Sequence, residues 1–330
     1  MPARGRRRFL RGSLALAGAS LLAGCGVVPP QPSPRSAKIG VFSDSALDPS
    51  PEGTAFSAAL RDLGYVEGRN LALAFRFAGQ PTTLASDAAA LIAQGVDVIV
   101  TVDDEATRAV RDASAAVPIV MADSRDPVRA GLIASLGRPG GNVTGVTSLM
   151  AVLGSKRLEL LRAVAPGVSR VAFLWAAHTG DLPDLREVEA AAQGMGVQLV
   201  PVIVTATRNM ALPLAGLSVP VDGMIVFTVA SARADATRIV ASLNATRLPA
   251  IYDAGSFAHA GGLMAYGANT PELFRRAATY VDKILRGAKP AELPVEQPTT
   301  LDFVINPKAA QALGLTIPQS VLQQATEVVQ

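Results

Sequence analysis

Cysteine and histidine are scarce in this 330-residue sequence, which contains one cysteine and two histidines. A single cysteine leaves no partner for an internal disulfide. His178 and His259 fall in predicted loops, and neither has a second histidine or a carboxylate at the spacing of a metal site. We therefore expect no metal, and no motif indicates another cofactor.

An excess of positive charge is also absent once the first eleven residues are set aside. The formal net charge is +3, and five arginines lie within residues 4–11, so the remainder of the chain is slightly acidic. This charge balance argues against a nucleic-acid partner. The first predicted strand is not followed by a Gly-x-Gly-x-x-Gly motif, because Gly40 lies inside that strand and Gly53 is the next glycine. A dinucleotide site is therefore not expected either.

The N-terminal segment has the pattern of an export signal. The arginines precede an apolar run at 13–23 that is too short to span a bilayer. Residues 5–11 resemble a twin-arginine signature, although general export remains an alternative. The Leu-Ala-Gly-Cys sequence at 22–25 resembles the lipobox of bacterial lipoproteins. We predict a signal peptide at 1–25, lipidation at Cys25 rather than an ordinary buried cysteine, and a Pro/Ser-rich tether at 26–36.

Beyond the tether, short apolar runs alternate with stretches of helical periodicity, which is typical of βαβ units in a parallel sheet. The predicted strands are 38–42, 71–77, 96–101, 118–122, 143–147, 170–175, 198–204, 223–227, 250–252, 261–267 and 303–305. The predicted helices begin at residue 51 and continue to residue 63, and then span 81–94, 105–115, 128–136, 156–164, 182–194, 233–245 and 271–285, with short helices beginning at Pro307 and Pro318. The fold class predicted is α/β.

The stretch 124–145 separates two sets of these units. Asp126 precedes Pro127 and cannot easily be helical, so a short helix is expected to begin at Val128. Four turn-forming residues, Gly137, Pro139, Gly140 and Gly141, are expected to stop it at Leu136. A break between two sets of parallel units predicts two doubly wound lobes, with a ligand cleft at the carboxyl ends of their strands.

Six segments carry a resemblance to a known family. They are Leu-Gly-Tyr-Val-Glu-Gly-Arg-Asn at 63–70, Val-Asp-Val-Ile-Val-Thr at 96–101, Asp-Pro-Val at 126–128, Arg-Pro-Gly-Gly-Asn-Val-Thr-Gly at 138–145, Lys-Arg-Leu-Glu-Leu-Leu at 156–161 and Phe-Arg-Arg-Ala-Ala at 274–278. With them the chain resembles the bacterial ABC-transporter substrate-binding proteins that include tryptophan- and tyrosine-type binding lipoproteins.

The resemblance implies a type I periplasmic-binding fold, in which three crossover strands join two lobes around a small ligand. The expected crossings are near 144–147, near Tyr266 and near 298–301. The N-terminal lobe is expected to comprise 37–145 and 267–300, and the C-terminal lobe 146–266 and 301–330. The resemblance also implies an ABC permease in the membrane as partner.

Candidate ligand-binding residues are the polar and aromatic residues at the carboxyl ends of the predicted strands. They are Ser43, Asp44, Thr101, Asp103, Asp126, Thr147, Trp175, Thr228, Asp253 and Tyr266. Hydroxyls and an aspartate at such positions suit a small zwitterion such as an amino acid, with Asp103 or Asp253 opposite its cation. The alternative is that the aspartates cap helices, which is favoured for Asp126, and that Trp175 belongs to the core.

The predicted function is a lipid-anchored solute-binding protein, exported to the periplasm or cell exterior, that delivers its ligand to an ABC permease. A ligand-sensing lipoprotein that serves a membrane receptor is an alternative, and an exported α/β enzyme is a weaker one. The sequence contains no Gly-x-Ser-x-Gly motif, and lipidation of Cys25 would remove the only thiol nucleophile, so no catalytic residues are expected.

Overall fold

The structure is a computed structural model that describes residues 36–43, 50–77, 81–148, 153–176, 185–204, 219–228, 232–233 and 235–329. Residues 36–330 form one compact unit. The predicted signal peptide with Cys25, residues 26–35 of the predicted tether, Asp44 and His178 lie outside the described residues. Within those ranges, no helix combines the length and apolar character needed to cross a membrane.

The first sheet contains five parallel strands in the order β2-β1-β3-β4-β5. Its strands are β1 (Ala37–Ser43), β2 (Leu71–Phe77), β3 (Val98–Thr101), β4 (Ile119–Ser124) and β5 (Val143–Thr147). The helices that follow the first three strands are α1 (Pro51–Asp62), α2 (Leu84–Ile92), preceded by a 3-10 turn at Pro81–Thr83, and α3 (Asp104–Ala113). This strand order is the doubly wound arrangement.

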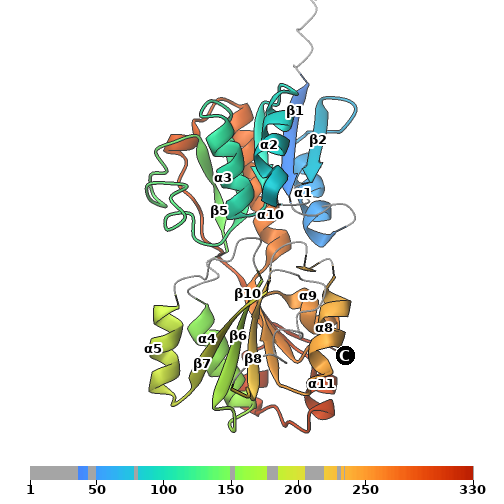
Figure 1. The fold of residues 1–330 in the computed structure, drawn as a ribbon. Coiled ribbons are helices and arrows are strands. Elements are labelled where there is room, and N and C mark those ends of the chain that lie inside the picture. The colour runs from blue at the N-terminus through green and yellow to red at the C-terminus, as the bar shows by residue number, and fades with distance from the viewer. Residues whose placement is uncertain are drawn as a thin grey trace, which may run out of the picture. The chain divides into compact units, whose positions relative to one another are not determined.

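Alternate residues of β3 show how both faces of this sheet are covered. Val98 and Val100 pack with α1 and with α10 (Thr270–Leu285), whereas Ile99 packs with α2 and α3. All four residues of β3 are buried, as a central parallel strand requires. Figure 1 shows α10, in orange, beside the blue and green elements of this lobe.

The second sheet contains seven strands in the order β12-β11-β10-β9-β8-β6-β7. Its strands are β6 (Arg170–Ala176), β7 (Gln198–Val204), β8 (Gly223–Phe227), β9 (Ala250–Tyr252), β10 (Met264–Ala268), β11 (Leu301–Ile305) and β12 (Glu327–Val328). Its helices are α4 (Gly154–Val164), α5 (Arg186–Gly194), α8 (Ala236–Asn244), α9 (Gly255–His259), α11 (Pro307–Ala312) and α12 (Gln319–Leu322). All described pairs in this sheet are parallel except β10 with β11.

The chain passes between the two sheets three times. It leaves the first sheet after β5, returns after β10 to form α10, and goes back through a 3-10 turn at Pro290–Glu292 to β11. The last crossing runs beside the first, because Thr147 N donates to Glu296 O at 3.0 Å and Glu296 N donates to Gly145 O at 3.0 Å. The predicted α/β class with two doubly wound lobes is confirmed. The residue boundaries of the lobes stay a prediction.

The prediction of a helix at 128–136 is wrong. A single turn forms there, in which Arg129 N donates to Asp126 Oδ1 and Ala130 N donates to Asp126 O. Gly131 then takes a left-handed conformation (φ 66°), which ends the turn. The next two residues, Leu132 and Ile133, are buried in the core beneath α2 and α3. Burial of these two apolar side chains overrides the local helical pattern.

Other predicted elements are present with shifted ends. The long helix expected at 81–94 begins as a 3-10 turn, and the strand expected from Gly261 begins only at Met264. Gly261 has a left-handed backbone (φ 103°), so it belongs to the turn before the strand. The sequence did not predict α9 or β12.

Candidate functional site

Hydroxyl and carboxylate side chains end the strands of the first sheet, and several are already engaged locally. Thr101 Oγ1 lies 2.7 Å from Thr107 Oγ1, one turn into α3. Asp103 is the N-cap of α3, where its Oδ1 accepts from Ala106 N at 2.6 Å. Ser43 and Thr147 are completely buried at the ends of β1 and β5. Asp126 caps the turn described above, so its side chain serves the loop.

Asp104, next to the capping residue, fixes the end of β4. Its Oδ1 accepts hydrogen bonds from Ser124 Oγ and, at 3.3 Å, from Arg125 N. Burial raises the pKa of Asp104, opposed by Ser124 and the nearby charge of Arg125. The acidic pair at 103–104 is thus used to shape the edge of this sheet: one carboxylate starts α3 and the other holds the β4 loop.

The second sheet presents a bonded pair at its edge. Thr228 follows β8 and Asp253 follows β9, the adjacent strand. Thr228 N donates to Asp253 Oδ2 at 2.9 Å, and Thr228 Oγ1 donates to Asp253 Oδ1 at 2.9 Å. Both residues are buried. These two sequence candidates are therefore brought together, and the threonine orients the carboxylate.

Arg157, on α4, is a buried cation near this pair that was not among the predicted site residues. Its Nε donates to Tyr266 O at 2.6 Å, and its guanidinium lies over the Phe227 ring, 4.4 Å from the centroid. Burial lowers the pKa of Arg157 to about 10, while Asp253 and Tyr266 act in the opposite direction. The only sequence signal was its position in the 156–161 segment, which looked like an ordinary amphipathic helix.

Trp175 lies at the end of β6 in an aromatic cluster. Its ring centroid is 6.4 Å from that of Phe173 and 5.5 Å from that of Phe227. The guanidinium of Arg125 lies over the indole at 5.0 Å from its centroid, within cation–π range. The indole Nε1 is buried, and no acceptor within the described ranges bonds to it. Trp175 therefore belongs to the hydrophobic core, and one face of its ring contacts Arg125 in the loop after β4.

An ion pair joins the first sheet to the start of the helical segment before α8. Arg233 Nη2 donates to Asp123 Oδ2 at 2.6 Å, and the side chains are 10% and 4% exposed. Burial alone would lower the pKa of Arg233, but Asp123, Asp253 and Glu52 together outweigh it and raise that pKa. Neither residue was among the predicted site residues, although Asp123 directly follows an apolar run and Arg233 begins a predicted helix.

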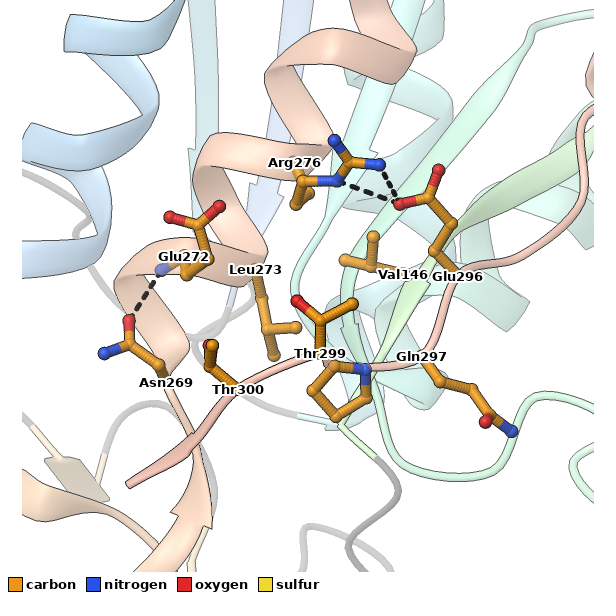
Figure 2. Close-up of a pocket in the computed structure, with 10 residues that line it drawn as sticks. Val146, Asn269, Glu272, Leu273, Arg276, Glu296, Gln297, Thr299 and Thr300 are labelled. Carbon is orange, nitrogen blue, oxygen red and sulfur yellow. Dashed lines mark hydrogen bonds and ion pairs between the residues drawn. The ribbon is translucent and has the colours of Figure 1, made fainter. Parts of the chain in front are cut away.

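A hollow lies where the crossings meet, on the first lobe's side of α10. It is lined by Val146, Asn269, Glu272, Leu273, Arg276 and residues 296–300. Figure 2 shows Arg276 facing Glu296, to which it is bonded, and Asn269 bonded to the backbone of Glu272. The Arg276–Glu296 pair ties α10 to the last crossing segment, and the bond of Asn269 caps α10.

Among the residues described, no cluster of histidine, cysteine, aspartate and glutamate could hold a metal ion. His259 instead lies 2.8 Å from Glu327 Oε1 at the exposed edge beside β12. The groups at the strand ends are therefore suited to recognising charge: two buried guanidinium groups, buried carboxylates and an indole lie near the carboxyl ends of parallel strands in the two sheets.

Comparison with known proteins adds to this geometry. Residues 39–329 match the family model described as ABC transporter substrate binding protein. The chain is 25% identical over 283 residues to the tyrosine-binding protein of Clostridioides difficile (strain R20291), covering 82% of this chain and 78% of that protein.

Two solved structures are similar over 89% of this chain and 100% of theirs. One is an ABC domain from Streptococcus pneumonia in complex with L-Trp, with a TM-score of 0.79 and 28% identity. The other is a conserved domain protein from Vibrio cholerae, with a TM-score of 0.81 and 26% identity.

Proposed function

Because the chain belongs to the ABC transporter substrate-binding protein family, we propose that it captures a small amino acid or similar zwitterion and delivers it to an ABC permease. As a member of that family it is an extracytoplasmic substrate-binding protein and not an enzyme. The observation that carries the proposal is the family match, which spans both lobes from residue 39 to residue 329.

The ligand class is supported by the relatives and by the charges at the strand ends. One similar protein is named for tyrosine binding, and one similar structure holds L-Trp. Of the two aspartates proposed from the sequence as the cation partner, Asp103 has a carboxylate oxygen engaged in capping α3. Asp253 is oriented by Thr228 at the edge of the second sheet and is the better candidate. Ser43, Thr101 and Thr228 remain the proposed hydroxyls around the anion.

Calorimetry with L-tryptophan and L-tyrosine tests the ligand class, after a thermal-shift screen that also includes sugars and nucleosides. A ligand that binds only the folded state raises the free energy of unfolding by about 2.7 kcal/mol at a hundredfold excess over its Kd. Replacement of Asp253 with alanine should weaken amino-acid binding about a hundredfold or more, because it strips a buried charge of its partner. Asp103→Ala serves as a comparison that removes a helix cap, worth about 1 kcal/mol of stability. A preference for a ligand without an amino group would refute the zwitterion proposal.

Lipid anchoring through Cys25 is proposed from the lipobox-like sequence at 22–25 and the Pro/Ser-rich segment after it. An acylated cysteine would hold the binding domain near the permease. Replacement of Cys25 with alanine should move the protein from the membrane fraction to the soluble fraction, as measured by fractionation and immunoblotting. Replacement of Ser20, inside the apolar run, with alanine is a matched control and should leave the distribution unchanged. Equal membrane association of wild type and Cys25→Ala would rule out the anchor.

A further inference from the structure

The end of β4 reaches the second lobe through two charged side chains. Asp123 bonds to Arg233, just before α8, and Arg125 lies over the ring of Trp175 at the end of β6. The intervening residue, Ser124, donates to Asp104 and holds this strand end in place. Asp123 and Arg125, on either side of Ser124, thus contact two separate elements of the other lobe.

The Asp123–Arg233 pair is buried, but each side chain uses only part of its hydrogen-bonding capacity. Asp123 Oδ1 and Arg233 Nε are both shielded from solvent, and no residue in the described part of the chain bonds to either atom. A guanidinium normally meets a carboxylate with two parallel N–H···O bonds, and the edge formed by Nε and Nη2 is suited to this. Here only Nη2 of that edge donates to Asp123. Each partner therefore retains capacity for one more charged hydrogen bond, and leaving it unfilled is unfavourable in a buried site.

The neighbouring charges distinguish Asp123 from the other carboxylates. Arg233 is influenced by three carboxylates, those of Asp123, Asp253 and Glu52. Both oxygens of Asp253 accept hydrogen bonds from Thr228, and Glu52 Oε1 accepts from Thr270 Oγ1 at 2.8 Å. Asp123 is the member of this group with a buried oxygen open to a new donor. A ligand ammonium group, which has three donors, would find a further partner there in addition to Asp253.

We propose that Asp123 and Arg233 form a charge clamp for the ligand: the internal pair opens, Asp123 takes the ligand's ammonium group, and the Nε and Nη2 of Arg233 take its carboxylate. One internal ion pair is thereby exchanged for two, so neither buried charge is left without a partner. The clamp rests on the proposed function, since it assigns residues to the zwitterion that this function requires. It also selects against ligands that carry only one of the two charges.

The test couples changes in the protein to changes in the ligand. Calorimetry on the purified full-length protein would use L-tryptophan, N-acetyl-L-tryptophan, which lacks the ammonium, and L-tryptophanamide, which lacks the carboxylate. On the wild type, each derivative should bind at least about a hundredfold more weakly than L-tryptophan. Asp123→Asn should lose a similar factor for L-tryptophan but bind N-acetyl-L-tryptophan as the wild type does. Arg233→Gln should also lose a similar factor for L-tryptophan but bind L-tryptophanamide as the wild type does.

Matched controls come from exposed ion pairs nearby in the chain. Asp112→Asn removes a surface carboxylate paired with Arg111, and Arg238→Gln removes a surface guanidinium paired with Asp235. Both controls should leave the Kd for L-tryptophan unchanged. If a single variant fails to fold, the double variant Asp123→Asn/Arg233→Gln leaves no orphaned charge. It should fold and still bind L-tryptophan at least about a hundredfold more weakly.

The outcomes separate the clamp from the function it rests on. If the wild type binds L-tryptophan and the double variant binds it equally well, the ion pair is purely structural and the clamp is overturned, while the proposed function stands. The clamp is likewise overturned, and the proposed function stands, if each variant loses affinity by the same factor for L-tryptophan and for its two derivatives. If the wild type binds no amino acid and instead binds an uncharged ligand, the proposed ligand class and the clamp both fail.

Discussion

At the scale of single residues, Gly145 is a position where both the available space and the backbone conformation disfavour a side chain. It lies in β5 with φ at 129°, and an added Cβ would lie 2.2 Å from Met121 O and 2.5 Å from Met121 N in the adjacent strand β4. Both groups belong to the backbone of a buried strand, so they cannot rotate away as a side chain would. This glycine therefore sets how closely β4 and β5 approach.

Replacement of Gly145 with alanine should lower the free energy of unfolding by at least about 2 kcal/mol, because the methyl group must displace β4 and sits on a left-handed backbone. Urea unfolding followed by circular dichroism measures the change. Gly141→Ala is the control, since its added Cβ would meet no atom within 4 Å and its backbone is not left-handed. Equal unfolding midpoints for both variants would contradict this account of Gly145.

Asp104 should make stability depend on pH. Burial raises the pKa of its carboxyl above the ordinary value of 3.8. Between the unfolded and folded pKa values the folded state binds more protons, so this group's contribution to stability is greatest at low pH and declines as pH rises through that window. Asp104→Asn keeps an oxygen for Ser124 and does not titrate.

The free energy of unfolding of Asp104→Asn minus that of the wild type should therefore increase as pH rises from 3.8 and then level off above the folded pKa. Urea unfolding at a series of pH values measures it. Asp112→Asn, an exposed acidic site on the same helix, is the comparison. Parallel pH profiles for wild type and Asp104→Asn would mean that the carboxyl titrates normally in the folded protein.

At the scale of elements, α10 is the helix that closes the first lobe although it follows strands of the second. Asn269 caps it by accepting from Glu272 N at 2.9 Å, and Pro271 lies in its first turn. Its buried face, which includes Phe274, packs with α1 and with the valines of β1 and β3. The first lobe's core is therefore incomplete until the chain has returned from the second.

Truncation of Phe274 to alanine should lower the free energy of unfolding by about 3 to 5 kcal/mol, because it removes a fully buried ring and leaves a cavity. Guanidinium unfolding monitored by circular dichroism measures it. The adjacent residue, Arg275, makes only an exposed pair with Glu272, so Arg275→Ala should change stability by less than about 1 kcal/mol. A loss below about 1 kcal/mol for Phe274→Ala would show that α10 contributes little to the core.

At the scale of the whole molecule, we propose that the three crossings act as a hinge. The segments near 144–147 and 296 are bonded to each other, and Tyr280 on α10 donates to Pro294 O. Such braced segments resist twisting of one lobe against the other while permitting bending. Ligand binding between the lobes is expected to favour the more closed arrangement.

Saturation with ligand should therefore reduce the radius of gyration measured by small-angle X-ray scattering. The comparison uses the same protein sample with L-tryptophan and with an equal concentration of glycerol, which carries no charge. Superimposable scattering curves for ligand-saturated and ligand-free protein would argue against closure.

The sequence by itself determined the alternation of strands and helices in both lobes. Local signals placed the bounds of β2, β5, β7, β8 and β9 where the structure has them, because short, largely apolar runs bounded by turn residues leave few other conformations. It also placed Thr228 and Asp253 at the carboxyl ends of their strands, which meet at one edge of the sheet. That β8 and β9 are neighbours, so that the two residues bond, was decided by the sheet order.

Tertiary structure alone decided the rest. Whether residues 128–136 form a helix depended on burying Leu132 and Ile133 beneath α2 and α3, which no local pattern records. The partners Asp123 and Arg233 are 110 positions apart in the sequence and belong to different lobes. Their pairing depends on how the end of β4 in one lobe faces the segment after β8 in the other. The spacing of residues along the chain does not predict that arrangement.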